Sequence, residues 1–435
     1  MKKYPKYKNS GIEWLGEIPV HWEVRRLKKC SIIKTGKTPR IANANTDYFK
    51  NGLINWFTPS DFYSQNGELL NSKRKITENA IKNKQVQLFK ENSIYLIGVG
   101  ATIGKIGYSI LKASANQQIN NIEFSKNIFY KFGYYALLVS RVQIQFLADF
   151  TTLPILNQTK TKEVLITIPS ISEQKAIAKF LDYKLEKINR FIAKKKQLIE
   201  LLKEQKAAII NRAVTKGLDP KVKMKDSGIE WLGEIPEHWI IAKMKNICSV
   251  RQGLQIVASE RHHQNNGSYY EYITIKGINN PTNPKEYIAN PSQRVICNKK
   301  NILMARTGAT GQVITNVEGV FHNNFFLVDY DTRKIYKEYL YYYLKSIKIK
   351  KYLLLVAGTT TIPDLNHGEF YNAPFFIFSI SEQKNIVAYI ETETQKIDTT
   401  ISTIEKEIGL VAEYKTALIA EAVTGKIDVR RVVFY

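Results

Sequence analysis

The segment SGIEWLGEIP occupies residues 10–19, and the same ten letters return at residues 227–236. The identity extends outward, since KNSGIEWLGEIPVHW (8–22) matches KDSGIEWLGEIPEHW (225–239) at 13 of 15 positions. A repeat at long period is the signature of a duplicated architecture. The chain is therefore expected to contain two copies of one structural unit.

Three further pairs of segments match at a slightly shorter offset. TLPILN (152–157) answers TIPDLN (361–366), SISEQKAIAKFLD (170–182) answers SISEQKNIVAYIE (379–391), and AVTKGLD (213–219) answers AVTGKID (422–428). These pairs are 209 residues apart, whereas the first pair is 217 residues apart. Constant segments thus bracket a variable region in each copy, and the second variable region is shorter.

Each SISE motif fits a capping box, with Ser170 or Ser379 as N-cap and Glu173 or Glu382 reaching back, so a long helix is predicted from each. Apolar residues follow at alternating steps of four and three over about six heptads, which indicates a coiled coil. A single amphipathic helix buried in a bundle is the alternative. The predicted seam comprises Leu181, Leu185, Ile188, Ile192, Ile199, Leu202 and Ile209 in the first helix, and Ile390, Ile397, Ile401, Ile404, Ile408, Val411 and Leu418 in the second. Lys206 and Lys415 take equivalent positions in this pattern, as a shared polar break or as lysines that extend to solvent.

The two predicted helices carry opposite net charges, +6 over 173–215 and −4 over 382–424, as partners should. If each repeated segment packs beside the variable region that follows it, the end of the first helix lies near the start of the second, and the pair is antiparallel. The first repeated segment then lies near the end of the second helix, and the chain ends meet. The expected packing residues are Trp14, Leu15, Ile18 and Trp22, with Trp231, Leu232, Ile235 and Trp239, and His21 and His238 are their expected structural partners.

The predicted fold class is α+β or α/β, with two small globular domains separated by an antiparallel two-helix coiled coil and related by a pseudo-twofold internal repeat. A helix of about 42 residues at ~1.5 Å rise spans roughly 60 Å, so the helix pair would act as a ruler between the domains. The expected boundaries are joint segment 1–22, first variable domain 23–169, helix 170–216, repeated joint segment 217–239, second variable domain 240–378, helix 379–425 and tail 426–435.

Composition narrows the function. The 435 residues carry 64 Lys and Arg against 39 Asp and Glu, a net charge of +25, which favours a polyanionic partner such as DNA. No run of apolar residues is long enough for a membrane span and no secretory signal is recognisable, so a cytoplasmic location is expected. Cys30, Cys248 and Cys297 lack disulfide or zinc spacing, and we expect reduced thiols.

Motifs for catalysis are weak. GVGATIGKIG (98–107) has Ile106 after Lys105, where a phosphate-binding loop needs Ser or Thr, so a tight turn between strands is expected. PD (363–364) with EQK (382–384) formally matches a nuclease, but the first copy has PI (154–155) and EQK begins a helix in both. The six histidines show no metal-ligand spacing. A non-catalytic protein is expected; the alternatives are a stand-alone DNA-modifying enzyme or nuclease, and a basic coiled-coil scaffold.

The duplicated SGIEWLGEIPxHW, the variable regions, the SISEQK helices and the AVT closings together resemble the specificity subunit of Type I restriction-modification systems over essentially the whole chain. The resemblance implies two target-recognition domains, each reading one half of an asymmetric bipartite DNA site with a fixed gap. It also implies that this chain holds no cofactor and binds two modification (methyltransferase) subunits, which methylate adenine with S-adenosylmethionine. Restriction subunits that use ATP and Mg²⁺ to translocate and cleave DNA would be further partners.

Candidate DNA-binding residues fall into two groups. Basic and polar loops supply Lys34, Thr35, Lys37, Arg40, Lys73, Arg74, Lys75, Arg251, Gln252, Lys299 and Lys300, which can reach phosphates and base edges. Carried over from the resemblance, INWFTPSDF (54–62) and EYITIKGI (271–278) imply that Thr58, Ser60, Asp61, Thr274 and Lys276 lie near DNA. The turns with Lys105 and Arg306 and the polar runs Gln117, Gln118, Asn323 and Asn324 complete the set, although part of the polar runs could be hydrogen-bonded within the domain.

Overall fold

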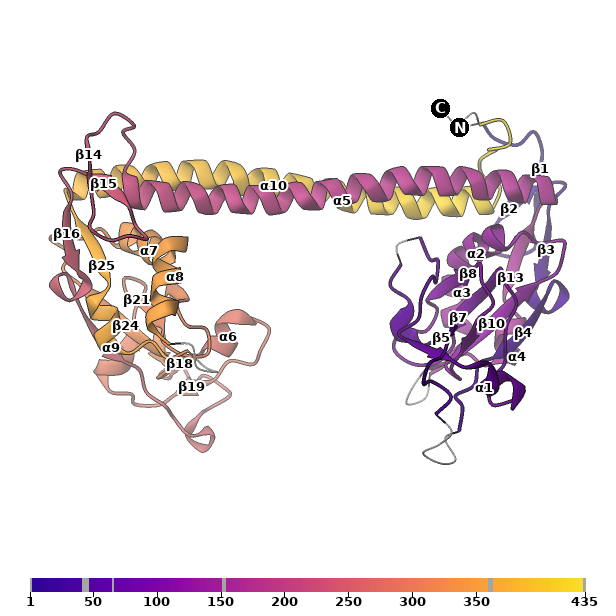
Figure 1. The fold of residues 1–435 in the computed structure, drawn as a ribbon, viewed down its shortest axis with the longest axis horizontal. Coiled ribbons are helices and arrows are strands. Elements are labelled where there is room, and N and C mark those ends of the chain that lie inside the picture. The colour runs from indigo at the N-terminus through magenta and orange to yellow at the C-terminus, as the bar shows by residue number, and fades with distance from the viewer. Residues whose placement is uncertain (1, 41–46, 65, 151–153, 359–362, 433–435) are drawn as a thin grey trace. The chain divides into compact units, whose positions relative to one another are not determined.

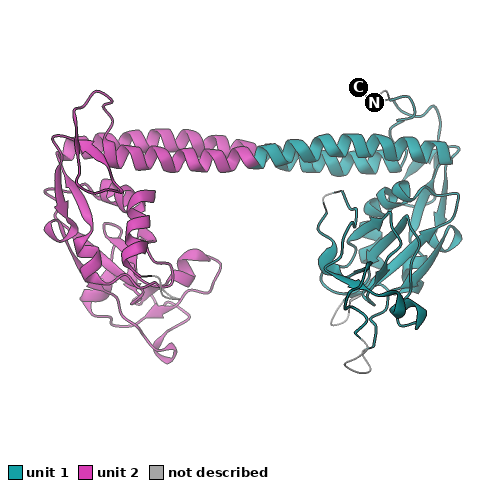
Figure 2. Ribbon diagram, in the orientation of Figure 1, with its two compact units in different colours: residues 1–196, 405–435 teal, residues 197–404 magenta. Residues whose placement is uncertain are grey.

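The computed structural model describes residues 2–40, 47–64, 66–150, 154–358 and 363–432. It contains two compact units, one made of residues 1–196 and 405–435 and the other of residues 197–404 (Figure 2). Each unit holds one variable domain, one joint segment and one part of each long helix. The first two residues of TLPILN and of TIPDLN lie outside the described residues.

The variable domain of unit 1 is built on an antiparallel sheet with strand order β4-β10-β7-β8. A second sheet has the order β6-β5-β9, in which β5 and β9 run parallel with Trp56 opposite Ser114. The strands are β1 (Tyr7–Asn9), β2 (Glu17–Pro19), β3 (Glu23–Arg26), β4 (Ser31–Thr35), β5 (Ile54–Phe57), β6 (Arg74–Ile76), β7 (Ser93–Ile97), β8 (Ile106–Ser109), β9 (Ser114–Ala115), β10 (Ile119–Phe124), β11 (Asp149–Phe150), β12 (Pro154–Ile155) and β13 (Leu165–Ile168). The short helices are α1 (Glu78–Lys82), α2 (Tyr130–Val139), α3 (Arg141–Leu147) and α4 (Gln158–Lys162).

The variable domain of unit 2 repeats this plan with the sheet β17-β24-β21-β22 and a second sheet β19-β18-β23-β20. Strands β18 and β23 are parallel, with Tyr272 opposite Val320, as β5 and β9 are in unit 1. The strands are β14 (Met224–Asp226), β15 (Glu234–Pro236), β16 (Ile240–Lys243), β17 (Cys248–Gln252), β18 (Tyr270–Ile273), β19 (Tyr287–Ile288), β20 (Ile296–Cys297), β21 (Ile302–Ala305), β22 (Val313–Thr315), β23 (Gly319–Phe321), β24 (Phe325–Tyr330) and β25 (Pro374–Ile377). The short helices are α6 (Ile275–Asn279), α7 (Lys337–Lys345), α8 (Ile347–Val356) and α9 (His367–Asn372).

Continuous apolar runs account for the central strands. SIYLI of β7 is buried at all five positions, as expected for a strand covered on both faces. One face contributes Ile94 and Leu96 to a core shared with Phe132 of α2, and the other contributes Tyr95 to a separate cluster around Phe57.

The long helices are α5 (Ile171–Lys216) and α10 (Ile380–Val423), and they lie side by side in both units (Figure 1). In unit 1, Leu181 near the start of α5 shares a core with Leu418 near the end of α10. In unit 2, Ala213 near the end of α5 shares a core with Ile390 near the start of α10. Within each unit the pair is therefore antiparallel, as the repeat predicted.

None of the fourteen residues of the predicted seam is exposed. Leu181, Leu185, Ile199, Ile390, Ile397, Ile404 and Leu418 are buried, and the other seven are half-buried. Their neighbours along the helices are mostly exposed, including Leu198, Leu201 and Leu410. The stripe therefore follows the heptad spacing and not hydrophobicity alone.

Polar contacts between the helices also follow the repeat. In unit 2, Nζ of Lys206 lies 2.6 Å from a carboxylate oxygen of Asp398. In unit 1, Nζ of Lys415 donates to Oδ1 of Asn189 at 2.8 Å. These two pairs are equivalent under the 209-residue offset. The lysines of the predicted polar break therefore bind the partner helix.

Candidate DNA-binding loops and the helix joint

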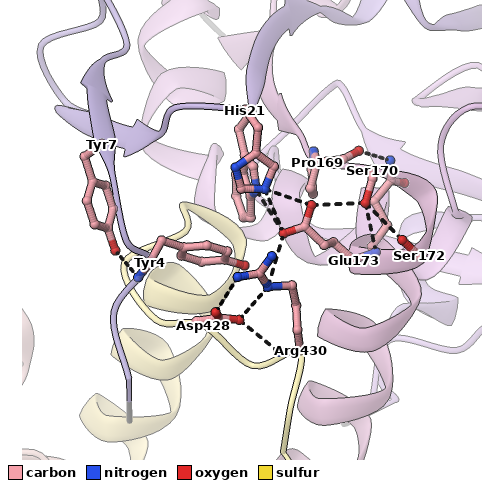
Figure 3. Close-up of polar contacts among 11 residues, drawn as sticks. Tyr4, Tyr7, His21, Pro169, Ser170, Ser172, Glu173, Asp428 and Arg430 are labelled. Carbon is pink, nitrogen blue, oxygen red and sulfur yellow. Dashed lines mark hydrogen bonds and ion pairs between the residues drawn. The ribbon is translucent and has the colours of Figure 1, made fainter.

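The start of α5 is tied to the first joint segment through one carboxylate. Nε2 of His21 lies 3.0 Å from Oε1 of Glu173, and Nε1 of Trp22 donates to the same oxygen at 3.4 Å (Figure 3). The side chain of Glu173 is only 6% exposed. Burial alone would raise the pKa of Glu173, but hydrogen bonds from His21 and Ser170 outweigh it and the pKa is lowered. The carboxylate is therefore held ionised as an anchor for the joint.

Unit 2 repeats this joint with the equivalent residues. Nε2 of His238 lies 2.9 Å from Glu382, and Nε1 of Trp239 donates to Glu382 at 3.0 Å. Both tryptophans of the two HW dipeptides are fully buried. The expected structural role of His21 and His238 is thus confirmed.

The predicted capping boxes are only half formed. The backbone N–H of Glu173 donates to Oγ of Ser170 at 3.4 Å, and that of Glu382 donates to Oγ of Ser379 at 3.2 Å. The carboxylate of Glu173 returns to the hydroxyl of Ser170 at 3.0 Å, and the joint residues bind both carboxylates. The predicted reach of Glu173 back to Ser170 is therefore present through the hydroxyl, but sequence spacing did not reveal the further donors from a distant segment.

The glutamine that follows each of these glutamates docks the variable domain onto the helix. Oε1 of Gln174 accepts from the backbone N–H of Phe129 at 2.7 Å, and its Nε2 donates to the carbonyl of Asn127 at 2.9 Å. Gln383 makes the same contacts with the N–H of Tyr336 and the carbonyl of Lys334, each at 2.8 Å. Both glutamines are buried and bind main-chain atoms at the start of α2 or α7. This accounts for the EQK motif in both copies.

The other packing residues of the joint behave mostly as expected. Leu15, Ile18, Leu232 and Ile235 are buried. Trp14 departs from the prediction, because its side chain is 48% exposed. Its counterpart Trp231 is half-buried and stacks on Tyr352, with ring centroids 5.1 Å apart.

The ends of the described chain meet beside the first joint. The backbone N–H of Asp428 donates to the carbonyl of Lys2 at 2.8 Å, and Nζ of Lys426 donates to the carbonyl of Glu17 at 2.6 Å. Arg430 bonds Asp428 at 2.7 Å and lies over the ring of Tyr4 (Figure 3). The predicted meeting of the chain ends is present in unit 1.

Three loops of the first variable domain converge where the parallel strands β5 and β9 end. The N–H of Asn116 donates to the carbonyl of Phe57 at 2.9 Å, and the N–H of Lys37 donates to the carbonyl of Ala115 at 2.8 Å. Gly36 allows this crossing, since a Cβ there would lie 2.2 Å from the carbonyl of Asn116. The loops after β4, β5 and β9 thus form one surface that includes Lys37, Thr58 and Gln117.

The second variable domain brings the equivalent loops together. The N–H of His322 donates to the carbonyl of Ile273 at 3.0 Å, and a Cβ on Gly253 would lie 2.3 Å from the carbonyl of His322. A side-chain bond recurs as well: Thr38 donates to Gln117 in the first domain, and Asn323 donates to Gln255 at 3.0 Å in the second. The framework of the loops is the same in both domains, although the side chains differ.

The turns that contain Gly98–Lys105 and Arg306–Gly311 flank these loops. The backbone N–H of Gly98 donates to the carbonyl of Gln118, and that of Arg306 donates to the carbonyl of Asn324, each at 2.8 Å. The first turn connects β7 to β8 and the second connects β21 to β22. The expected tight turn between strands is confirmed, and the turns belong to the same surface.

The predicted DNA-binding residues differ in availability. Lys37, Arg40, Ser60, Lys73, Arg74, Lys105, Gln117, Lys276, Lys299 and Lys300 are exposed, and Lys34, Thr35, Thr58, Lys75, Gln118, Arg251, Gln252, Thr274, Arg306, Asn323 and Asn324 are half-buried. Asp61 is buried, with its carboxylate accepting from the N–H groups of Thr58 at 2.7 Å and Lys73 at 2.9 Å. Asp61 therefore shapes the loop from inside and is not positioned to contact DNA.

Several other candidates are committed within their own domain. Arg251 pairs with Asp329 at 2.6 Å, and Arg306 pairs with Asp364 at 2.7 Å. Thr35 donates to Oδ1 of Asn120 at 2.8 Å. These three contacts were not predicted; the internal hydrogen bonding expected for part of the polar runs is present at Gln117 and Asn323.

Arg74 is exposed and preorganised. Its guanidinium carbon lies 3.6 Å from the ring centroid of Phe49 and 5.4 Å from that of Trp56. Such stacking restricts the side chain and leaves the guanidinium donors free for an anion. The sequence placed Arg74 in a basic run without indicating this aromatic support.

A cavity of about 650 Å³ opens beside the loops of the second domain. Its lining includes the predicted residues Thr274, Lys276 and Asn324, together with Arg261 and His322. The last two were not predicted, because neither stands in a recognisable motif. Among the residues that the structure describes, no cluster of His, Cys, Asp and Glu could hold a metal ion, and no helix is long and apolar enough to span a membrane.

The chain resembles known proteins over nearly its whole length. The family model for the type I restriction modification DNA specificity domain matches twice, at residues 19–201 and 236–409. The specificity subunit of type I restriction enzyme MjaIX from Methanocaldococcus jannaschii is 24% identical over 432 residues, with 95% of each chain covered. That of MjaVIII from the same organism is 22% identical, with 96% of this chain and 95% of the relative covered. That of EcoBI from Escherichia coli is 23% identical over 72% of this chain and 69% of the relative.

Solved structures share the fold. A chain from a structural study of complex assembly and conformational transition in a type I R-M system superposes with a TM-score of 0.73, at 13% identity, covering 94% of this chain and 99% of that chain. The HsdS subunit from Thermoanaerobacter tengcongensis gives a TM-score of 0.54, also at 13% identity, covering 94% of this chain and 98% of that one. The two family-model matches together span most of the sequence, and each includes one variable domain and the start of the long helix that follows it. The chain belongs to the family of type I restriction modification DNA specificity proteins.

Proposed function

We propose that this chain is the non-catalytic specificity subunit of a Type I restriction-modification complex. Each variable domain reads one half of an asymmetric bipartite DNA target, and the helix pair sets the unspecified gap between the halves. The observation that carries this proposal is the repeated convergence of the loops at the ends of β5 and β9 and of β18 and β23. The two domains share the backbone arrangement of these loops but differ in the side chains on them. Each domain can therefore recognise a different short DNA sequence.

The free cations on and around these loops support DNA as the ligand. Nζ of Lys73, Lys105 and Lys276 has no hydrogen-bond or ion-pair partner among the described residues, and all three side chains are exposed. A lysine without an internal partner can neutralise a phosphate and release its condensed counterion. Base edges are then left to the shorter polar side chains, such as Thr58, Gln117 and Thr274.

The catalytic partners in this proposal are those that the family implies. Two modification subunits would methylate adenine with S-adenosylmethionine, and restriction subunits would use ATP and Mg²⁺ to cleave DNA. Recognition of DNA in this setting also agrees with the expected cytoplasmic location. In this proposal the chain selects the DNA sequence, and its partners catalyse methylation and cleavage.

The test is selection of DNA by the full chain assembled with its modification partners. Methylome sequencing of a host that carries the assembled system should return one motif with two specific blocks and a constant gap. Binding that depends on charge but selects no sequence would support the scaffold alternative instead. Methyl transfer or cleavage by the purified chain alone would support the enzyme alternative.

A further inference from the structure

In the cavity of about 650 Å³ in the second variable domain, the carboxylates of the lining are paired within the protein, whereas several hydrogen-bond donors are not. It lies between the loop after β18 and the segment that follows β23, where the predicted DNA-binding residues gather. Its two carboxylates are both paired, Glu271 with Lys285 at 2.6 Å and Glu286 with Arg261 at 3.1 Å. The charges of these four residues therefore cancel inside the site.

Thr274, Lys276 and His322 of the lining each present a hydrogen-bond donor that no described residue occupies. Nζ of Lys276 has no partner among the described residues. The hydroxyl of Thr274 accepts from the N–H of Gly277 at 3.1 Å, so its own hydrogen is free to donate. The third donor belongs to His322. The amide of Asn324 offers both a donor and an acceptor and does not change this balance.

The tautomer of His322 is fixed by its own turn. Nδ1 accepts from the backbone N–H of Asn324 at 3.0 Å, so in the neutral ring the proton resides on Nε2. Nε2 has no partner among the described residues and is not one of the buried unpaired atoms, so it is open to solvent. The ring packs against Tyr272 at 5.6 Å, and Tyr272 donates in turn to the carbonyl of Leu254 at 2.9 Å. His322 is thus a rigid donor at the cavity.

The equivalent position in the first domain shows what is particular to the second. Asn116 occupies it, and its Oδ1 accepts from the N–H of Gln118 at 3.1 Å, which is the same contact that Nδ1 of His322 makes. The side-chain nitrogen Nδ2 of Asn116 donates to Oε1 of Gln118 at 2.9 Å. Asn116 is buried and uses its oxygen and one N–H group of its amide in the turn, whereas the Nε2–H group of His322 is open to solvent.

We propose that His322 and Lys276 are specificity-determining residues that read a guanine of the second half-site, donating to its O6 and N7. Guanine presents two adjacent acceptors in the major groove, whereas adenine presents one acceptor beside a donor and cytosine presents a donor. A site whose free groups are mainly donors matches the guanine edge best. This inference rests on the proposed function and adds to it the base that the cavity selects.

The test uses the full chain assembled with its modification partners and a DNA library randomised over both half-sites. The variant His322→Asn keeps the acceptor for the turn, as Asn116 does in the first domain, and removes the Nε2–H donor of the imidazole ring. The variant Lys276→Met removes the second donor at an exposed position where folding is not at risk. The matched control is Lys299→Met, an exposed lysine outside the cavity lining.

We expect each of the first two variants to lose about tenfold or more of the preference for guanine at one position of the second half-site. The first half-site, which the same molecule reads, should be unchanged, and this also shows that the variant is folded. Lys299→Met, at the opposite end of the sheet from these loops, should leave base preference unchanged at both half-sites.

The inference would be overturned if both variants selected the same second half-site as the wild type. It would also be overturned if the second half-site of the wild type contained no guanine. If the wild-type chain selects no bipartite site at all, the proposed function fails instead, so the two failures are distinguishable.

Discussion

Lys206 and Asp398 form an ion pair of 2.6 Å between α5 and α10, and the equivalent pair in the other unit is Lys415 with Asn189, a cation with a neutral amide. Burial lowers the pKa of Lys415, because no acid compensates for the loss of solvent. The contact of Lys415 with Asn189 therefore has an electrostatic defect, because it lacks the negative charge that Asp398 supplies to Lys206.

Asn189→Asp should repair this defect. We expect the free energy of unfolding to rise by about 0.5–1 kcal/mol, the range for a partly exposed pair. Asp398→Asn, the reverse change at the equivalent site, should lower it by a similar amount. Urea unfolding of the full chain measures both changes, and hydrogen exchange along α5 locates them. A stabilising Asp398→Asn would show that desolvation outweighs attraction in this pair.

Glu173→Gln should destabilise the first joint more than Glu382→Gln destabilises the second. Both changes weaken charge-assisted hydrogen bonds from histidine and tryptophan, worth about 1–2 kcal/mol. The carboxylate of Glu173 is 6% exposed and that of Glu382 is 30% exposed, so the first loss should be larger. The two single variants and the double variant, compared by thermal unfolding, test this order. Equal losses would contradict a role for burial.

The Glu173 contribution also has a defined pH dependence. Its pKa is lowered in the folded chain, so its stabilisation is complete above the ordinary glutamate pKa of about 4.3 and is lost as the pH falls through the lower folded value. The difference in stability between the wild type and Glu173→Gln should therefore shrink below about pH 4 and stay constant near neutrality.

Arg74→Ala should weaken binding about equally on all DNA sequences. A phosphate contact carries no base information, and its loss should make the slope of log binding constant against log salt shallower by about one. Arg74→Lys keeps the charge but loses the planar stacking on Phe49, so an intermediate affinity is expected. Lys203→Ala on α5, an exposed lysine outside the loops, is the control. A change in base preference would place Arg74 on a base edge.

Exchange of residues 23–152 for the variable segment of a relative should change one specific block of the DNA target and leave the other. The reason is that Gln174 binds only main-chain atoms of Asn127, Phe129 and Pro169, which any replacement segment of the same fold supplies. The end of this segment lies outside the described residues, so the junction should be varied by a few residues. Methylome sequencing of hosts with each chimera gives the answer.

Acid should weaken recognition by the second domain selectively. Burial, followed by the charge of Arg261, lowers the pKa of His322, and Glu286 opposes this only in part. The neutral ring is the native form, so its contribution is complete above the ordinary histidine pKa of about 6.5 and is lost as the pH falls through the lower pKa of the folded chain. Protonation of Nδ1 would break the bond from Asn324. Preference at the second half-site should decline toward pH 5 in the wild type but not in His322→Asn.

Much of this architecture was predictable because its signals are local or duplicated. The heptads from Leu181 and from Ile390 specify a helix pair, and the repeated HW dipeptides indicate where that pair meets each domain. The carboxylate of Glu173 was predicted only as a capping group, because its donors in the joint segment lie more than 150 residues away in the chain.

The binding loops were harder to predict for the same reason. The parallel pairing of β5 with β9 brings Phe57 beside Ala115, and no local pattern reports that contact. Asp61 was assigned to DNA from the family resemblance of INWFTPSDF (54–62), whereas three backbone and side-chain donors draw its carboxylate inward. Composition indicated a basic DNA-binding protein, but the pairing of strands decides which side chains lie on the surface proposed to contact DNA.

The hydrogen bond between Lys2 and Asp428 holds two segments from opposite ends of the sequence together, so the segments could be joined in a different order without breaking this contact. A short linker could join the two ends beside the first joint, and new ends could be opened in the equivalent stretch 217–223 beside the second. Such a circular permutant would keep every strand pairing and both glutamate anchors. The contacts within each unit therefore do not by themselves fix the order in which the segments are joined.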